Sequence, residues 1–145
     1  MKFPFEPKST TCLRQGQYWC FQLSNGRFAC GTVLARTTSQ GKLHRSMFLG
    51  GLLNWSGLSL PTSSGIKNAR VLQSGFMHVK AIQHNGREVL GQLDEALKTS
   101  AEVEYTGLTV DGPPLWGLAY IRALAEDSFG NPEWSDQELQ KVRKK

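Results

Sequence analysis

Acidic residues are scarce in the first half of this sequence, which is therefore strongly basic. Residues 1–80 contain ten Lys and Arg residues but a single acid, Glu6, which gives a net charge of +9. Residues 81–140 contain three basic residues and eleven acids, a net charge of −8, and the last five residues add +4. Such asymmetry can steer a charged partner toward one half of the molecule. If the two halves face each other in the fold, their charges instead cancel in part.

Long apolar runs are also missing. No stretch approaches the roughly 18 apolar residues that a membrane-spanning helix needs, and residues 1–6 lack the apolar core of a signal peptide. We therefore expect a cytoplasmic protein. The three cysteines, Cys12, Cys20 and Cys30, are odd in number and lack metal-ligand spacing. In a reducing compartment they are expected to be free thiols.

The length and composition are those of one folded domain. The chain has 145 residues, of which 39% are hydrophobic and 20% are charged, a profile typical of globular proteins. Fifteen glycines and six prolines indicate many turns, which favours short strands over a helical bundle. We expect a single domain over 1–145, with an N-terminal arm at 1–15 and a basic, frayed tail at 141–145.

The strongest local signal is a β-hairpin at Tyr18–Leu34. Asn25-Gly26 supplies the two positive-φ residues of a type I′ turn between apolar strands. A two-residue loop would place Phe21 opposite Cys30. Trp19, Phe21 and Leu23 would then share the core-facing side with Phe28 and Cys30. Cys20 and Cys30 would lie on opposite faces, so no bridge between them is expected.

The rest of the chain predicts more hairpins and a few helices. Residues 75–91 repeat the pattern with a turn at Asn85-Gly86, which predicts a second hairpin. The apolar run 47–55 predicts a buried strand, and 61–71, 113–126 and the segment from Ser135 onward predict helices. We predict an α+β domain with an antiparallel twisted sheet, or a partly closed small barrel, and two or three helices mainly near the C-terminus.

The candidates for chemistry are three histidines and a pair of acids. His78 and His84 would lie on one strand about 20 Å apart, and His44 lies in a polar segment that could join either. Asp94 and Glu95 could act as general acid and base. A metal site needs three converging ligands, so we expect no metal. No phosphate-binding glycine loop occurs, so we expect no cofactor.

Candidates for partner binding are basic and aromatic residues. A protein partner would meet exposed cations and aromatic anchors, and the residues we select are Tyr18, Arg27, Arg36, Arg45, Trp55 and Trp134. The basic and aromatic residues of the first hairpin are also compatible with stacking and neutralising single-stranded nucleic acid. The competing interpretation is that the aromatic face of this hairpin is core.

A family resemblance adds to these patterns. The segment 16–34, with Asn25-Gly26 at its turn and the Gly31-Thr32-Val33 step at its end, resembles the opening of the immunity protein 26 family. That family is also grouped with HocA-type phosphotriesterases. Three later segments are similar to members of the family as well: Phe48–Trp55, His78–Lys80 and Leu115–Gly117. The resemblance covers roughly residues 15–126.

The resemblance implies a cytoplasmic immunity protein that binds and neutralises a cognate toxin of a bacterial polymorphic toxin system. It carries over no catalytic residue. The first alternative is a small hydrolase acting on organophosphate esters, which would bring His44, His78, His84, Asp94 or Glu95 together in a pocket. The second is a module that binds single-stranded nucleic acid. Binding of a protein partner is expected and binding of a membrane is not.

Overall fold

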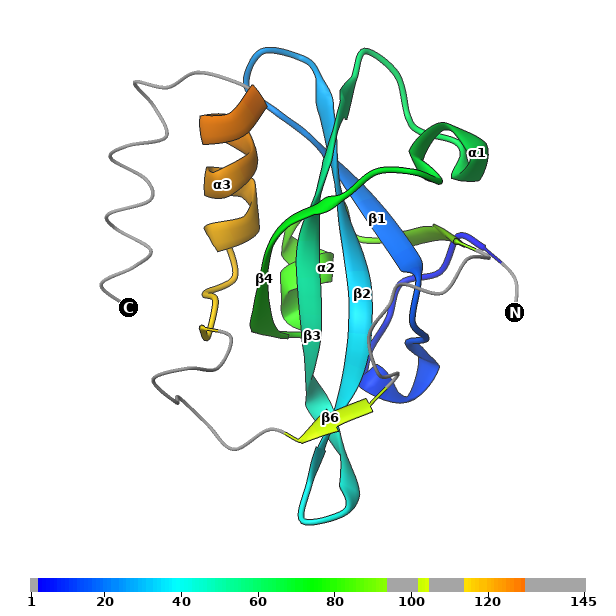
Figure 1. The fold of residues 1–145 in the computed structure, drawn as a ribbon, viewed down its shortest axis with the longest axis vertical. Helices are drawn as coiled ribbons and strands as arrows, with labels where there is room; N and C mark the ends of the chain where they lie inside the picture. Colours follow the sequence, from blue (N-terminus) through cyan, green and yellow to red (C-terminus); the bar gives the residue numbers. More distant parts are fainter. Residues whose placement is uncertain (1–2, 94–101, 105–113, 130–145) are drawn as a thin grey trace.

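The computed structural model describes residues 3–93, 102–104 and 114–129. The strands are β1 (Gln17–Gln22), β2 (Phe28–Ser39), β3 (Lys42–Gly57), β4 (Val71–His78), β5 (Val89–Gln92) and β6 (Glu102–Glu104). The helices are the 3-10 turn η1 (Thr10–Cys12), α1 (Ser63–Ile66), α2 (Lys80–His84) and α3 (Tyr120–Phe129) (Figure 1). None of the described helices is long and apolar enough to cross a membrane.

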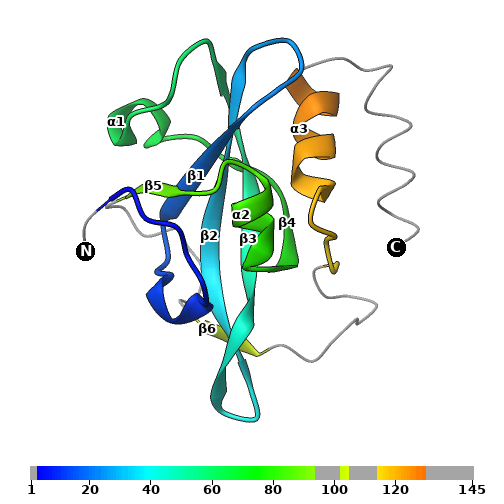
Figure 2. The ribbon, with the colours of Figure 1, turned by 180° about the vertical axis from the view of Figure 1, so that it is seen from behind.

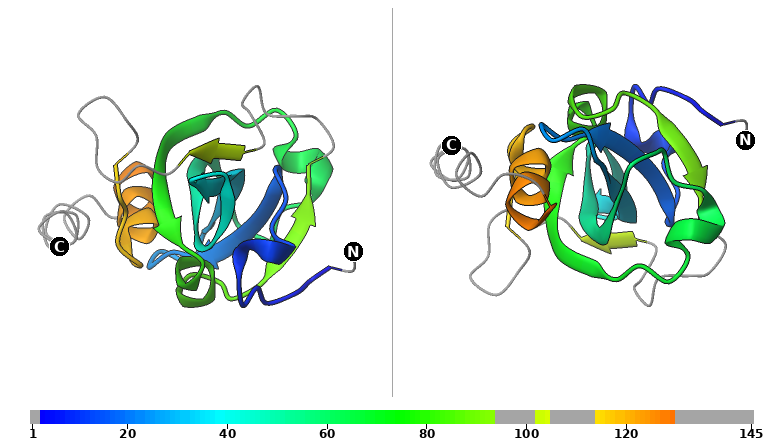
Figure 3. Two further views of the ribbon diagram at one scale, coloured as in Figure 1. Left: turned by 90° about the horizontal axis from the view of Figure 1, so that it is seen from below. Right: turned by 90° about the horizontal axis from the view of Figure 1, so that it is seen from above.

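The strands form one curved sheet. Five of them are antiparallel in the order β4-β3-β2-β1-β5, and β6 pairs in parallel with the far part of β2. Figure 3 shows the curl of the sheet end-on, with α3 beside its β4 edge and α1 near the opposite side. The path begins at β4 and ends at β5, so among the described residues the sheet is open and no closed barrel forms. The predicted α+β class is confirmed.

The first hairpin is present, but its predicted register is wrong by one residue. Cys20 lies opposite Cys30 and Phe21 opposite Ala29. The loop has three residues, because the Leu23 N–H donates to the Arg27 carbonyl (2.7 Å) and in the turn only Gly26 has a positive φ. Such a loop is a type I turn followed by a left-handed glycine. The extra loop residue moves Cys30 to the face that carries Cys20.

The second predicted hairpin is wrong. β4 ends at His78 and pairs with β3, whereas β5 pairs with β1. Between them residues 80–84 form α2. The apolar residues Val79, Ala81 and Ile82 are buried there, and helical geometry brings them to the core side. His78 and His84 therefore do not share a strand.

The predicted helices also differ in extent. α1 covers only Ser63–Ile66 of the segment predicted at 61–71. The helix predicted at 113–126 begins at Tyr120, since the residues before it bond to the edge of β4. There the Phe76 N–H donates to the Pro114 carbonyl (2.8 Å), and the Trp116 N–H donates to the Phe76 carbonyl (2.7 Å). An edge strand offers such backbone groups for pairing. The helix predicted after Ser135 and the tail at 141–145 lie outside the described residues.

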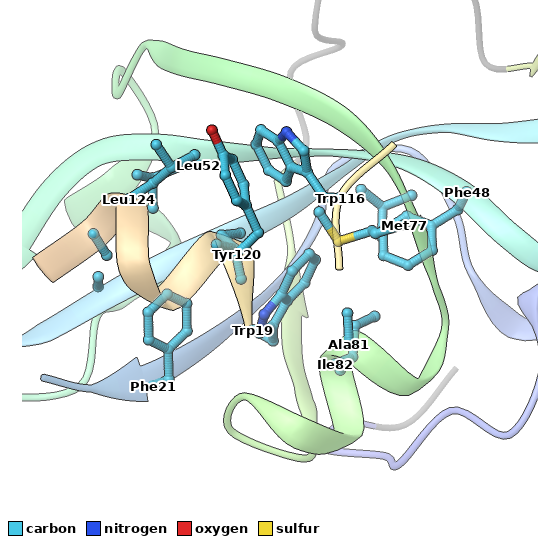
Figure 4. Close-up of a cluster of buried hydrophobic side chains, with 14 of the residues drawn as sticks. Trp19, Phe21, Phe48, Leu52, Met77, Ala81, Ile82, Trp116, Tyr120 and Leu124 are labelled. Carbon is cyan, nitrogen blue, oxygen red and sulfur yellow. The ribbon is translucent and has the colours of Figure 1, made fainter. Parts of the chain in front are cut away.

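The main core lies between one face of the sheet and the helices α2 and α3. Figure 4 shows Trp19, Phe48, Met77 and Ile82 converging there with Trp116 from the segment before α3. The Trp19 and Phe48 rings meet edge to face at 5.9 Å, a favoured aromatic geometry. Burying each large apolar side chain is worth about 1.5–3 kcal/mol. These contacts fix α2 and α3 on the sheet.

A smaller cluster covers the other face of the sheet. It contains Tyr18, Cys20, Cys30, Leu53, Ile66 and Leu93. The Tyr18 hydroxyl and the Ser63 hydroxyl share a hydrogen bond (3.0 Å), which joins β1 to α1. The two cysteines therefore lie in an apolar layer beneath α1.

Candidate functional site

A wide bulge interrupts the pairing of β2 with β3. Arg36 pairs with Phe48 and Thr38 with Leu43, so residues 44–47 stand against Thr37 alone. A histidine side chain inside the bulge helps to hold its backbone. The Nδ1 of His44 accepts from the N–H groups of Ser46 (3.3 Å) and Met47 (3.2 Å). Bulges of this kind re-aim side chains, often beside functional sites.

Two further hydrogen bonds attach the bulge to its surroundings. The Thr37 hydroxyl donates to the Met47 carbonyl (2.6 Å), and the Thr10 hydroxyl donates to the His44 carbonyl (2.6 Å). Thr10 belongs to η1, so the N-terminal arm lies against the bulge. Figure 2 shows this arm on the same side of the sheet as α2. The bulge is thereby held from both sides.

The end of β4 brings a second histidine to the bulge. His78 pairs with Met47 in the β3–β4 ladder, and the Val79 N–H donates to the Ser46 carbonyl (2.7 Å). The His78 Nδ1 accepts from the Lys80 N–H (3.0 Å). Burial, followed by the nearby charges of Lys80 and His44, lowers the pKa of His78 below its ordinary value. Burial and these neighbouring charges therefore favour the uncharged form of His78.

The hydrogen bonds of the two imidazoles define their chemistry. In both His44 and His78 the Nδ1 accepts a backbone hydrogen bond, so the neutral ring carries its proton on Nε2. An Nε2–H group donates a hydrogen bond, but it neither abstracts a proton nor ligates a metal. Within the described residues no three His, Cys, Asp or Glu side chains gather as a metal site would require. The arrangement suits recognition of an electronegative group.

The remaining candidates for chemistry do not join this pair. His84 is exposed in the last turn of α2. Asp94 and Glu95 lie outside the described residues. Of the residues proposed for hydrolysis, the structure therefore brings together His44 and His78.

Basic residues occur on three segments that hydrogen bonds join at the bulge. Lys8, Arg45 and Lys80 are exposed, and His44 and His78 are half-buried. Lys8 follows Pro7, whose carbonyl accepts from the Gln83 side chain of α2 (2.7 Å), and precedes Thr10, which is bonded to the bulge. Residues 8–10, 44–47 and 78–80 contain no acid. We call the set Lys8, His44, Arg45, His78 and Lys80 the basic corner.

The other residues selected for partner binding lie in varied surroundings. Tyr18 is buried, so it lacks the exposed surface that an anchor needs. Arg27 is half-buried and donates to the Ser56 hydroxyl (3.0 Å) and carbonyl (3.2 Å). Trp55 is half-buried against the smaller cluster, and Arg36 is half-buried on β2. Trp134 lies outside the described residues.

The stacking surface expected for nucleic acid is also largely core. Trp19 and Phe21 are buried and Phe28 is half-buried. A single-strand binding site needs exposed ring faces, whereas Trp19 and Phe21 belong to the main core. Phe28, predicted to share their face, lies opposite Gln22 on the other face of the hairpin. The interpretation of the first hairpin as core is therefore the one that the structure supports.

Polar contacts join α3 to the first hairpin, and the sequence patterns did not predict them. The buried Glu126 carboxylate accepts from the Ser24 N–H (3.1 Å) and from the Ser24 hydroxyl (3.1 Å). The Arg122 guanidinium donates to the Gln22 carbonyl (2.5 Å) and lies 5.3 Å from the centre of the Phe21 ring. These contacts attach α3 to the hairpin loop and to the end of β1. The only sequence signal was a four-residue spacing of Arg and Glu on one helix face.

Comparisons with protein-family models, curated proteins and solved structures find no match. A functional interpretation therefore depends on the geometry of the basic corner.

Proposed function

We propose that this domain is a cytoplasmic binding protein of the immunity type, which neutralises a toxin by placing its basic corner on an acidic surface of that toxin. The observation that carries the proposal is the basic corner itself. Three exposed cations and two imidazoles lie on segments that hydrogen bonds and the core hold in place. A site that is rigid before binding loses less conformational entropy when its partner arrives.

The chemistry of the corner favours binding over catalysis. Because the Nδ1 of each imidazole accepts a backbone hydrogen bond, the Nε2–H group is left to donate a hydrogen bond to a carboxylate. The exposed Arg45 and Lys80 add attraction that acts before contact and raises the rate of association. A carboxylate-rich protein surface satisfies both kinds of group. A nuclease active site does not, because it is itself basic in order to receive phosphate.

A binding experiment with matched charge reversals tests the proposal. Genes adjacent to the one for this chain would be expressed with it, and any toxin-like product that co-purifies would be titrated calorimetrically. We compare R45E/K80E, which reverses two charges in the corner, with K67E/R70E, which reverses two exposed charges just after α1. In Figure 1, α1 lies far from the β2–β3 hairpin tip. Both variants change the net charge equally.

We expect R45E/K80E to raise the dissociation constant roughly tenfold to a hundredfold at low salt, mainly through slower association. The effect should shrink as salt is added, because exposed charges are screened. K67E/R70E should bind like the parent protein. If both variants weaken binding equally, the effect comes from net charge and not from the basic corner. If R45E/K80E binds like the parent protein, the basic corner is not part of the interface. If no neighbouring product binds, the immunity proposal fails for this chain.

A further inference from the structure

Two buried cysteines face each other across the first hairpin. Cys20 of β1 lies directly opposite Cys30 of β2, and both side chains belong to the cluster beneath α1. Both are free thiols, with exposed fractions of 6% for Cys20 and 0% for Cys30. Burial and then a hydrogen bond with Cys20 raise the pKa of Cys30 far above its ordinary value. The strand pairing therefore places the two thiols side by side on one face of the hairpin.

The hydrogen-bond pattern of the hairpin determines which kind of pair they form. The Leu23 N–H donates to the Arg27 carbonyl, so residues 23 and 27 are a hydrogen-bonded pair. Hydrogen-bonded and non-bonded pairs alternate along an antiparallel ladder, and the β1–β2 register has no shift. Cys20 and Cys30, three pairs further on, are therefore a non-bonded pair. Such pairs have Cα atoms about 4.5 Å apart, within the roughly 4.4–6.8 Å that a disulfide spans.

We propose that Cys20 and Cys30 are an oxidisable dithiol, which closes to a cross-strand disulfide when the folded protein meets a hydroperoxide. The proposal is independent of the basic corner, which lies on other segments. It requires no large backbone movement, because the strand register already places the two thiols side by side.

The reaction proceeds in two balanced steps. The Cys20 sulfur, which retains some exposure, attacks one oxygen of hydrogen peroxide; the O–O bond breaks, and the departing hydroxide takes the thiol proton as water. Cys20 is then a sulfenic acid. The Cys30 sulfur attacks the Cys20 sulfur, the S–O bond breaks, and the departing hydroxide takes the Cys30 proton as a second water. The two thiols lose two electrons in total, and the peroxide gains them.

The test treats the full chain with hydrogen peroxide in a C12S background, because Cys12 is exposed and would join chains together. We expect the intact mass to fall by about 2 Da and to return on reduction. Peptide mapping should find residues 20 and 30 linked. The oxidised protein should keep its near-ultraviolet circular dichroism and melt at a higher temperature, because the bridge restricts the unfolded chain.

Two single variants test the order of the steps. In C12S/C30S, Cys20 should be trapped by the sulfenic-acid reagent dimedone, whereas in C12S/C20S the buried Cys30 should react much more slowly. If the C12S protein keeps both thiols, or if the bridge forms only at the rate of global unfolding in urea, the proposal is overturned. A bridge that lowers the melting temperature would also overturn it, because the folded geometry would then not fit the disulfide.

Discussion

The same dipeptide, Asn-Gly, occurs twice in this chain and performs two different tasks. Asn25-Gly26 lies in the loop of the β1–β2 hairpin, whereas Asn85-Gly86 ends α2. Both glycines have positive φ, +86° at Gly26 and +95° at Gly86. The dipeptide therefore marks a left-handed residue in both places. It does not specify whether a strand or a helix precedes that residue.

The two sites differ in what surrounds them. Asn25 is exposed, and a side chain built on Gly26 would meet nothing within 4 Å. Asn85 is fully buried, and its Nδ2 donates to the carbonyls of Ala81 (2.8 Å) and Leu118 (2.6 Å). A side chain built on Gly86 would collide with the backbone carbonyl of Cys20. The first dipeptide is a surface turn. The second is a junction that joins α2 to α3 through the buried Asn85 side chain and to β1 through the close approach of Gly86 to Cys20.

The largest effect that separates the two sites should come from replacing each glycine by alanine. G86A meets both the cost of a positive φ and a collision with backbone, which together we place at roughly 2–5 kcal/mol of unfolding free energy. G26A meets only the cost of the positive φ, about 1–2 kcal/mol. Urea denaturation followed by circular dichroism measures both. Equal losses would mean that the junction at Gly86 is looser than the structure describes.

The next effect should come from the asparagine side chains. N85A removes both donors described above and the acceptor of the Arg122 Nε–H (3.3 Å), and it leaves the buried Ala81 carbonyl with fewer partners. We expect a loss of about 2–3 kcal/mol. N25A removes bonds to the Arg27 N–H (3.0 Å) and the Phe129 carbonyl (3.1 Å) at an exposed position, for about 1 kcal/mol.

Thermal unfolding of both variants would measure the difference. A loss at N25A as large as that at N85A would show that the connection between α3 and the hairpin loop stabilises the fold as much as the buried junction does. N85D tests the direction of the bonds. It keeps the shape but places an acceptor oxygen against the carbonyls of Ala81 and Leu118, so it should be at least as destabilised as N85A.

The comparison also shows where sequence patterns succeed and fail in this chain. Apolar alternation around Asn25-Gly26 predicted the first hairpin and the inward face of Trp19 and Phe21, which the structure confirms. The pattern could not supply the register. Asn-Gly is compatible with a two-residue loop and with a three-residue loop; the structure has the three-residue loop, and its Ser24 is bonded to the distant Glu126. Around Asn85-Gly86, the short segment 79–82 has apolar residues that fit a strand or a single helical turn, and long-range pairing of β5 with β1 decides between them.

The candidate site was partly predictable for a similar reason. The basic excess of the first half and the individual residues His44, Arg45 and His78 were visible in the sequence. Their proximity in the fold was not visible in the sequence. It depends on a bulge in β3, where the register of β2 against β3 shifts between Arg36 and Thr38. Lys8 and Lys80 were not selected, since nothing local distinguishes them from other exposed lysines. Only the approach of η1 and α2 to the bulge gives them a role.

The smallest effect we predict concerns pH and two histidines, His78 just before α2 and His84 in its last turn. His78 precedes the helix, and its pKa is lowered by burial and by nearby Lys80 and His44. Between that lowered value and the ordinary pKa of about 6.5, the unfolded chain binds more protons than the folded one. Unfolding free energy should therefore rise as pH increases through this window, and H78N should flatten the rise. H84N, a change at an exposed position, is the matched control and should leave the slope in place. Urea titrations from pH 5 to pH 7.5 would measure how the unfolding free energy changes with pH. If H78N keeps the same slope as the parent protein, another group is responsible for the pH dependence, and His78 is more open to water than its contacts with the bulge imply.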